Sequence, residues 1–295
     1  MTEWILSIEG TPMAAQVAMI LALVAALAHA TLGALQKGRF DPWLSRGAID
    51  ICASAIAIPV VFLVPAPTWD VFILLPAVFV VHLAYKWVLA MAYSRGAFTA
   101  VYPVVRGTGP LATVIFAILI FGESYDLGQW AGIAMLSGGI FGLAAYNLRH
   151  ARLDSPEIAT ALALAVLTGV IVAVYTVLDA YVIRLTPDPF TFIAWFFLME
   201  GFNFPPFLWR RWRQAQDLGR LFRRGLIGAL IAWVSFGAVF LATRLDKVGE
   251  AAVLRETSVV FAAIIGWLFL RERIGPVRAA LMGVIAAGAV FVEFG

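Results

Sequence analysis

Long runs of apolar residues alternate with short polar or charged segments along nearly the whole chain. A hydrocarbon core about 30 Å thick requires about 20 apolar residues per helix. The runs are continuous, without the apolar–polar alternation of a β-barrel, so they favour membrane-spanning helices. We predict ten spans, which cover residues 14–36, 43–64, 69–93, 97–121, 127–148, 156–183, 189–209, 224–244, 249–270 and 275–294.

The composition supports a membrane protein. Of the 295 residues, 62% are hydrophobic and only 13% are charged, and the mean hydropathy is +0.92. A soluble domain is typically about 45–50% apolar and about 25% charged. Lipid must therefore surround most of the surface. We expect a multi-pass protein of the cell (inner) membrane, with membrane lipid and a small-molecule substrate as partners and no nucleic acid.

Basic residues are distributed unevenly between the predicted loops. Most of the Lys and Arg residues follow odd-numbered spans, and residues 210–224 alone hold six arginines. Loops rich in Lys and Arg stay in the cytoplasm. The distribution therefore predicts that both termini lie on the outer side.

The two halves of the chain share rare polar residues at a fixed offset. Arg106 and Arg255 each lie inside an apolar, membrane-length segment, and they are 149 positions apart. Five spans separate equivalent positions, so the two copies would have opposite orientations. We predict two inverted five-helix repeats, 14–148 and 156–294, around a central cavity. The same offset also pairs Arg95 with Arg244, Thr108 with Thr257, Glu123 with Glu272, and Gly139 with Gly288.

Two stretches at equivalent places, 90–139 and 240–288, share an order of small, acidic and glycine residues. In the first stretch these residues are Pro110, Gly122, Glu123, Gly132 and Gly139. The second stretch keeps Glu272 and Gly283 but has Val259 in place of the proline. This order resembles an EamA-type domain of the drug/metabolite transporter superfamily.

The resemblance covers nearly the whole chain as two five-span copies. It implies an all-α, ten-helix exporter of small metabolites with a cavity between the halves. Within the superfamily, His82, Tyr85 and Tyr102 make the YddG-like aromatic amino acid exporters the nearest group.

Ten polar or aromatic residues inside the spans form the predicted substrate site. Charged residues in lipid are costly and mostly face a polar interior, and rings at mid-depth lie too far in for an interfacial belt. A carboxylate-binding arginine, an ammonium-binding acid and aromatic rings would suit a zwitterion with an apolar or aromatic side chain. The candidates are His82, Tyr85, Lys86, Tyr102, Arg106, Tyr175, Asp179, Trp195, Glu200 and Arg255.

Helical spacing assigns the two arginines of the predicted repeats. Tyr102, Arg106 and Pro110 share one face of the fourth span, and the proline predicts a kinked or broken helix. A structural ion pair with a carboxylate of another helix is the alternative role for Arg106. Arg255 and Glu256 are adjacent and point about 100° apart, so at most one of them faces the site fully. We favour Arg255, because it is the repeat equivalent of Arg106.

Some intramembrane charges have a local explanation. Arg46 lies four residues before Asp50, so a structural ion pair within one helix accounts for both residues. His82 and Glu200 could instead carry protons if transport is coupled to a pH gradient.

We therefore expect a secondary transporter that exports small amphipathic metabolites, in particular aromatic or apolar amino acids, by alternating access. A channel-like uniporter for metabolites is the open alternative. An intramembrane enzyme is disfavoured, because the sequence contains neither GxSxG nor HExxH. We expect no cofactor and no metal. The oligomeric state stays open, although fused halves remove the need for a dimer.

Overall fold

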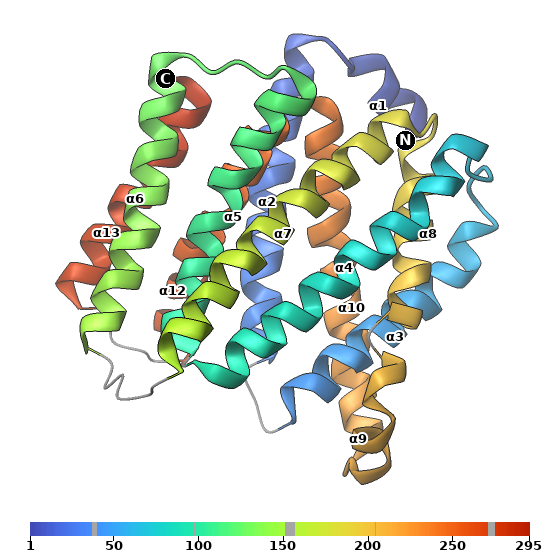
Figure 1. Ribbon diagram of the computed structural model, residues 1–295. Helices are drawn as coiled ribbons and strands as arrows, with labels where there is room; N and C mark the ends of the chain where they lie inside the picture. The colour runs from blue at the N-terminus through green and yellow to red at the C-terminus, as the bar shows by residue number, and fades with distance from the viewer. Residues whose placement is uncertain (37–39, 97, 151–156, 204, 271–274) are drawn as a thin grey trace. The chain divides into compact units, whose positions relative to one another are not determined.

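The computed structural model describes residues 1–36, 40–96, 98–150, 157–203, 205–270 and 275–295, and all regular elements in these ranges are helices (Figure 1). They are α1 (Thr2–Ile8), α2 (Pro12–Gln36), α3 (Pro42–Val61), α4 (Trp69–Arg95), α5 (Phe98–Phe121), α6 (Leu127–His150), α7 (Ile158–Leu185), α8 (Pro189–Asn203), η1 (Pro205–Leu208), α9 (Trp209–Gln214), α10 (Leu218–Leu245), α11 (Val248–Arg255), α12 (Ser258–Leu270) and α13 (Pro276–Phe294).

Nine segments in the described part of the chain are long and apolar enough to cross a membrane. One of the ten predicted spans, 189–209, is not among them, because no described helix in this region is long enough. There, α8 contains only 15 residues, which extend about 22 Å at 1.5 Å per residue. The short 3₁₀ helix η1 begins at Pro205. Pro205 and Pro206 lack the amide donors that a continuing helix needs.

The predicted ninth span is interrupted after Arg255, where α11 ends. The Thr257 amide donates to the Leu254 carbonyl at 3.1 Å, and the Thr257 hydroxyl donates to the same oxygen at 2.7 Å. The Glu256 amide likewise reaches back three residues, to the Val253 carbonyl at 3.0 Å. These short-range bonds tighten and end α11 before α12 begins.

The break that the sequence predicted at Pro110 is not observed. Helix α5 continues through both Pro103 and Pro110. The Thr113 hydroxyl donates to the Gly109 carbonyl at 2.9 Å, inside the same turn. Side-chain hydroxyls of this kind help to satisfy backbone groups near prolines in membrane helices.

Helix packing divides the chain into two compact units. The boundaries fall inside α4 and α7, so each unit takes helices from both predicted repeats, 14–148 and 156–294. The units are therefore not the repeats, and the inverted repeat remains a prediction. Unit 1 comprises Met1–Leu83 and Asp179–Leu245, and unit 2 comprises Ala84–Leu178 and Asp246–Gly295.

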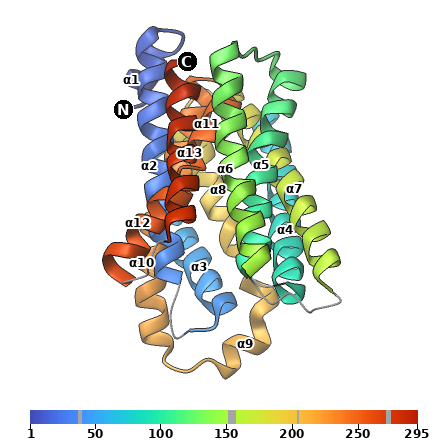
Figure 2. The ribbon, with the colours of Figure 1, turned by 90° about the vertical axis from the view of Figure 1, so that its left-hand side faces the viewer.

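Unit 1 is built around α10, which packs against α2 and α3, while α3 also packs against α8. Figures 1 and 2 show α2 and α10 side by side. Gly228 permits the contact with α3, because a Cβ there would lie 2.7 Å from Ile49 Cγ1. The Trp233 indole donates across the same interface to the Ala53 carbonyl at 3.2 Å.

Unit 2 is built around the pair α6 and α13, which run side by side in both views (Figures 1 and 2). Helix α5 packs against α6 and against α11. A Cβ on Gly288 would lie 2.6 Å from the Leu136 amide nitrogen, and one on Gly132 would lie 2.5 Å from that of Val292. The helices thus approach backbone to backbone, as small residues allow in membranes.

Candidate functional site

The buried charges of unit 2 gather around Arg106 on α5. Its Nε lies 3.0 Å from Glu256 Oε2, and its Nη1 donates to Glu256 Oε1 at 3.1 Å. Its Nη2 donates to the Ser258 hydroxyl at 2.5 Å. Arg106 is 9% exposed and Glu256 is 2% exposed. The contacts form a buried, two-point guanidinium–carboxylate pair, the strongest geometry for such ions.

The break between α11 and α12 gives Glu256 its place in this cluster. Glu256 lies in the turn and Ser258 opens α12, and both side chains reach Arg106. The sequence-based choice of Arg255 over Glu256 assumed a continuous helix. In the structure both residues are buried, and Glu256 is the partner of Arg106.

Arg255 occupies the end of α11 and is 7% exposed. Its guanidinium is close enough to Tyr175 to interact with it electrostatically. Its charge also acts on the Glu256 carboxylate, which therefore interacts with both arginines.

Aromatic rings surround these charges in unit 2. The Tyr85 and Tyr175 rings meet edge to face with centroids 5.3 Å apart. The Arg106 guanidinium lies 5.6 Å from the centroid of Tyr102, which is within cation–π range. Lys86 is also buried in this unit. Unit 2 therefore holds six of the ten predicted site residues.

Unit 1 holds the other four predicted residues, beginning with a buried acid–base pair. His82 Nε2 on α4 lies 2.9 Å from Asp179 Oδ2 on α7. The Phe196 ring meets the imidazole edge to face at 5.0 Å. Both polar residues are buried, so the pair can hold a proton away from water.

A second polar cluster in unit 1 centres on Arg46. Its Nε lies 3.0 Å from Asp50 Oδ1, which confirms the ion pair predicted from their spacing. Its Nη2 lies 3.5 Å from Glu200 Oε2. One guanidinium thus interacts with two buried carboxylates.

Trp195, the last of the predicted residues, lies on α8 in unit 1. Its ring packs edge to face against Phe72 at 6.3 Å. Its buried indole nitrogen has no hydrogen-bond partner among the residues that the structure describes. The ring therefore serves as an apolar wall, and its donor could bind a ligand.

Glu123 is a functional candidate that the sequence analysis did not include in the site. Its carboxylate accepts the amides of Val248 at 2.6 Å and Gly249 at 3.1 Å, and the Tyr125 hydroxyl at 2.5 Å. Burial and the Glu123 carboxylate raise the pKa of Tyr125, so its hydroxyl remains a donor. Glu123 thus caps α11, the helix that ends at Arg255. In the sequence, the pairing of Glu123 with Glu272 at the offset of 149 positions was the pattern that could have identified it.

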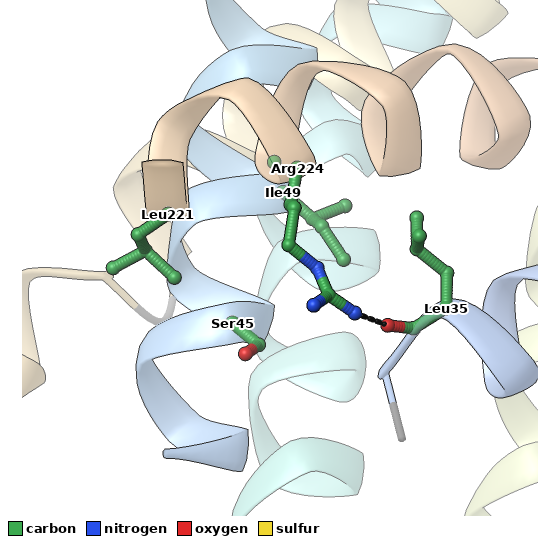
Figure 3. Close-up of a pocket in the computed structure, with 6 residues that line it drawn as sticks. Leu35, Ser45, Ile49, Leu221 and Arg224 are labelled. Atoms are coloured by element: carbon green, nitrogen blue, oxygen red, sulfur yellow. Dashed lines mark hydrogen bonds between the residues drawn. The ribbon is translucent and has the colours of Figure 1, made fainter. Parts of the chain in front are cut away.

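A small, open pocket lies in unit 1. It is lined by Leu35, Ser45, Ile49, Leu221, Arg224 and Gly225. Figure 3 shows Arg224 reaching across to the Leu35 carbonyl, to which it donates at 2.6 Å. None of the ten predicted site residues lines this pocket. In the described ranges, no group of three His, Cys, Asp or Glu side chains could hold a metal ion.

The nine apolar helices and the buried charges define a multi-pass membrane protein. Residues 159–294 match the EamA-like transporter family, so this part of the chain is EamA-like. The match implies transport of small molecules. Members of this family are generally non-enzymatic transporters.

The fold matches solved structures. One of them, described only as "Crystal structure of protein", has a TM-score of 0.77 and 17% sequence identity, covering 94% of this chain and 98% of that chain. At this identity, the likeness concerns the fold alone. No curated protein matches the sequence.

Proposed function

We propose that the protein is a secondary transporter that exports small amphipathic metabolites, in particular aromatic or apolar amino acids, by alternating access. The observation that carries the proposal is the cluster of buried arginines and tyrosines in unit 2. Charges at this depth are costly in lipid and are characteristic of substrate or ion pathways. The EamA-like match over residues 159–294 supports the same function.

Unit 2 supplies groups for both ends of an amphipathic substrate. The buried cations, Lys86, Arg106 and Arg255, can bind a carboxylate. The rings of Tyr85 and Tyr175 offer an edge and a face to an apolar or aromatic side chain.

Unit 1 supplies buried acids. Within this unit, Asp179 and Glu200, whose present partners are His82 and Arg46, are groups that could bind an ammonium ion. His82 could instead carry a proton, alone or with Glu200. Transport would then be driven by a pH gradient; otherwise the protein would equilibrate its substrate across the membrane.

Uptake by proteoliposomes tests the proposal. Purified protein should show saturable flux of an amino acid, measured with and without a pH gradient. Substrate on the opposite side should accelerate the flux if the protein is a carrier, but not if it is a channel. An absence of saturable flux for every metabolite in a broad panel would overturn the proposal.

Two substitutions test the assignment of the site. Arg106→Ala and Tyr102→Ala should abolish transport while the protein still inserts into the membrane. Arg220→Ala is a suitable control, because its side chain is largely exposed and pairs with Asp217, three residues away on the surface. Wild-type rates in both site variants would remove this site from the proposal.

A further inference from the structure

Three buried charged groups lie together in the described part of unit 2, and their positive and negative charges do not balance. They are the guanidiniums of Arg106 and Arg255 and the carboxylate of Glu256. One negative charge therefore stands against two positive charges. A buried charge without a counter-ion is strongly unfavourable, so this cluster is complete only when an anion joins it.

The two arginines differ in how far their hydrogen-bonding groups are satisfied. Nη1 and Nη2 of Arg106 donate to Glu256 and Ser258, and its Nε lies 3.0 Å from Glu256 Oε2 as an ion-pair contact without a hydrogen bond. Arg255 interacts electrostatically with Tyr175, and its buried Nε has no hydrogen-bond partner in the described part of the chain. Arg255 is thus the guanidinium with capacity left for a ligand.

The helix break places the beginning of α12 near Arg255, next to the end of α11, whose partial negative charge lies at Arg255 itself. Helix α12 begins three residues later, at Ser258, and runs for 13 residues. The beginning of a helix carries a partial positive charge and attracts anions. The break also fixes Glu256 on Arg106, which leaves Arg255 at the end of α11.

The neighbouring rings indicate what kind of anion fits. Tyr175 interacts electrostatically with Arg255 and packs its ring against Tyr85, so the charged group has aromatic neighbours. A planar carboxylate matches the two-point geometry of a guanidinium. An apolar or aromatic group attached to it would lie against the rings.

We infer that Arg255 binds the carboxylate of the transported substrate, while Arg106 and Glu256 form a fixed pair that holds the helix break in place. This inference rests on the proposed function and narrows its substrate class to amphipathic carboxylates. The amine of an amino acid is then dispensable, whereas the carboxylate is required.

Ligand-induced thermal stabilisation of the purified protein tests the inference with three compounds that share one ring. Phenylalanine carries both charged groups, 3-phenylpropionate only the carboxylate and phenethylamine only the amine. A ligand that binds the folded state raises the melting temperature. The first two compounds should raise it and phenethylamine should not. Stabilisation by phenethylamine equal to that by phenylalanine would overturn the inference.

Variants identify the residue that binds. Arg255→Gln should weaken the binding of 3-phenylpropionate about 10- to 100-fold, the loss expected for hydrogen bonds to a charged group. Arg255→Lys should retain part of the affinity because it keeps the charge. Arg278→Gln is the matched control, since this exposed arginine of the same unit contacts Asn147. Unchanged binding in Arg255→Gln would overturn the inference.

The unliganded variant separates a binding role from a structural one. Without ligand, Arg255→Gln should melt at or above the temperature of the wild type, because it removes an incompletely paired buried charge. A large drop in that temperature would show that Arg255 is structural and would overturn the inference. If Arg255→Gln liposomes still transport phenylalanine at wild-type rates, the inference fails while the proposed function stands.

Discussion

The two units use opposite ratios of charge in their buried clusters. In unit 1 the guanidinium of Arg46 faces two carboxylates, those of Asp50 and Glu200. In unit 2 the carboxylate of Glu256 interacts with two guanidiniums, those of Arg106 and Arg255. The surplus partner is an acid in one cluster and a base in the other.

Access to solvent also differs between the clusters. The Arg46 side chain is 26% exposed, whereas the Arg106 and Glu256 side chains are 10% and 2% exposed. Water can therefore help to compensate the charge of Arg46, and the unit 2 residues depend on one another. The comparison indicates that unit 1 tolerates the loss of one carboxylate, because the other still pairs with Arg46, whereas unit 2 does not tolerate the loss of Arg106.

The largest expected effect comes from removing Arg106. Arg106→Ala leaves the buried carboxylate of Glu256 with only the charge of Arg255 and should destabilise the protein by about 3–5 kcal/mol. Asp50→Asn should cost clearly less, because Glu200 still pairs with Arg46, whose side chain is 26% exposed. Unfolding in detergent, followed by tryptophan fluorescence, measures both losses.

A double variant tests the cause. Arg106→Met combined with Glu256→Leu removes the whole ion pair and should recover most of the stability but not transport. Equal losses in Asp50→Asn and Arg106→Ala would contradict the contrast between the units.

Helix packing gives a second contrast of smaller size. In unit 2, a side chain at Gly288 would meet the backbone of Leu136, which has little freedom to move. In unit 1, a side chain at Gly228 would meet the end of the Ile49 side chain, which can rotate. Gly288→Val should therefore cost about 1–3 kcal/mol or more, and Gly228→Val should cost less. The reverse order of melting temperatures would show that the units are equally tolerant.

The cap of α11 tests whether the unit 2 site depends on remote support. Glu123→Ala removes the acceptor for the Val248 and Gly249 amides and should cost about 0.5–2 kcal/mol. Glu123→Gln keeps one acceptor oxygen and should cost less. Because α11 ends at Arg255, ligand affinity should fall in the same order. Affinity that is unaffected in Glu123→Ala would separate the cap from the site.

The smallest expected effect is a gain in stability. Gly283 lies within α13 and has no atom near the place of an added Cβ in the described structure. Gly283→Ala should stabilise the helix by about 0.5–1 kcal/mol. It also serves as the control for Gly288→Val on the same helix. A loss of stability would reveal a contact that α13 makes elsewhere.

The spans were predictable because lipid imposes a simple rule of length and polarity, which nine helices satisfy in the described residues. The break after Arg255 was not predictable in the same way, since neither proline nor glycine marks it. A threonine hydroxyl bonded to the backbone ends α11 there. At Pro110, the conspicuous residue, the helix continues.

The sequence predicted which residues belong to the site better than it predicted which of them form pairs. Burial cost alone identified Arg106, His82 and Glu200 as important intramembrane residues. Their partners depend on which helices pack together, and single-helix spacing predicted only the pair of Arg46 and Asp50. The omission of Glu256 followed from treating α11 and α12 as one helix.

The division of both units between distant parts of the chain constrains how the protein is made. Unit 1 is complete only after the ribosome has synthesised residue 245, the end of its second segment. Unit 2 is complete only after residue 295 has been synthesised. Helices of the first half must therefore wait in the bilayer, with buried groups such as Arg106 not yet matched to Glu256. Insertion factors that shield polar helices would be needed most during this interval.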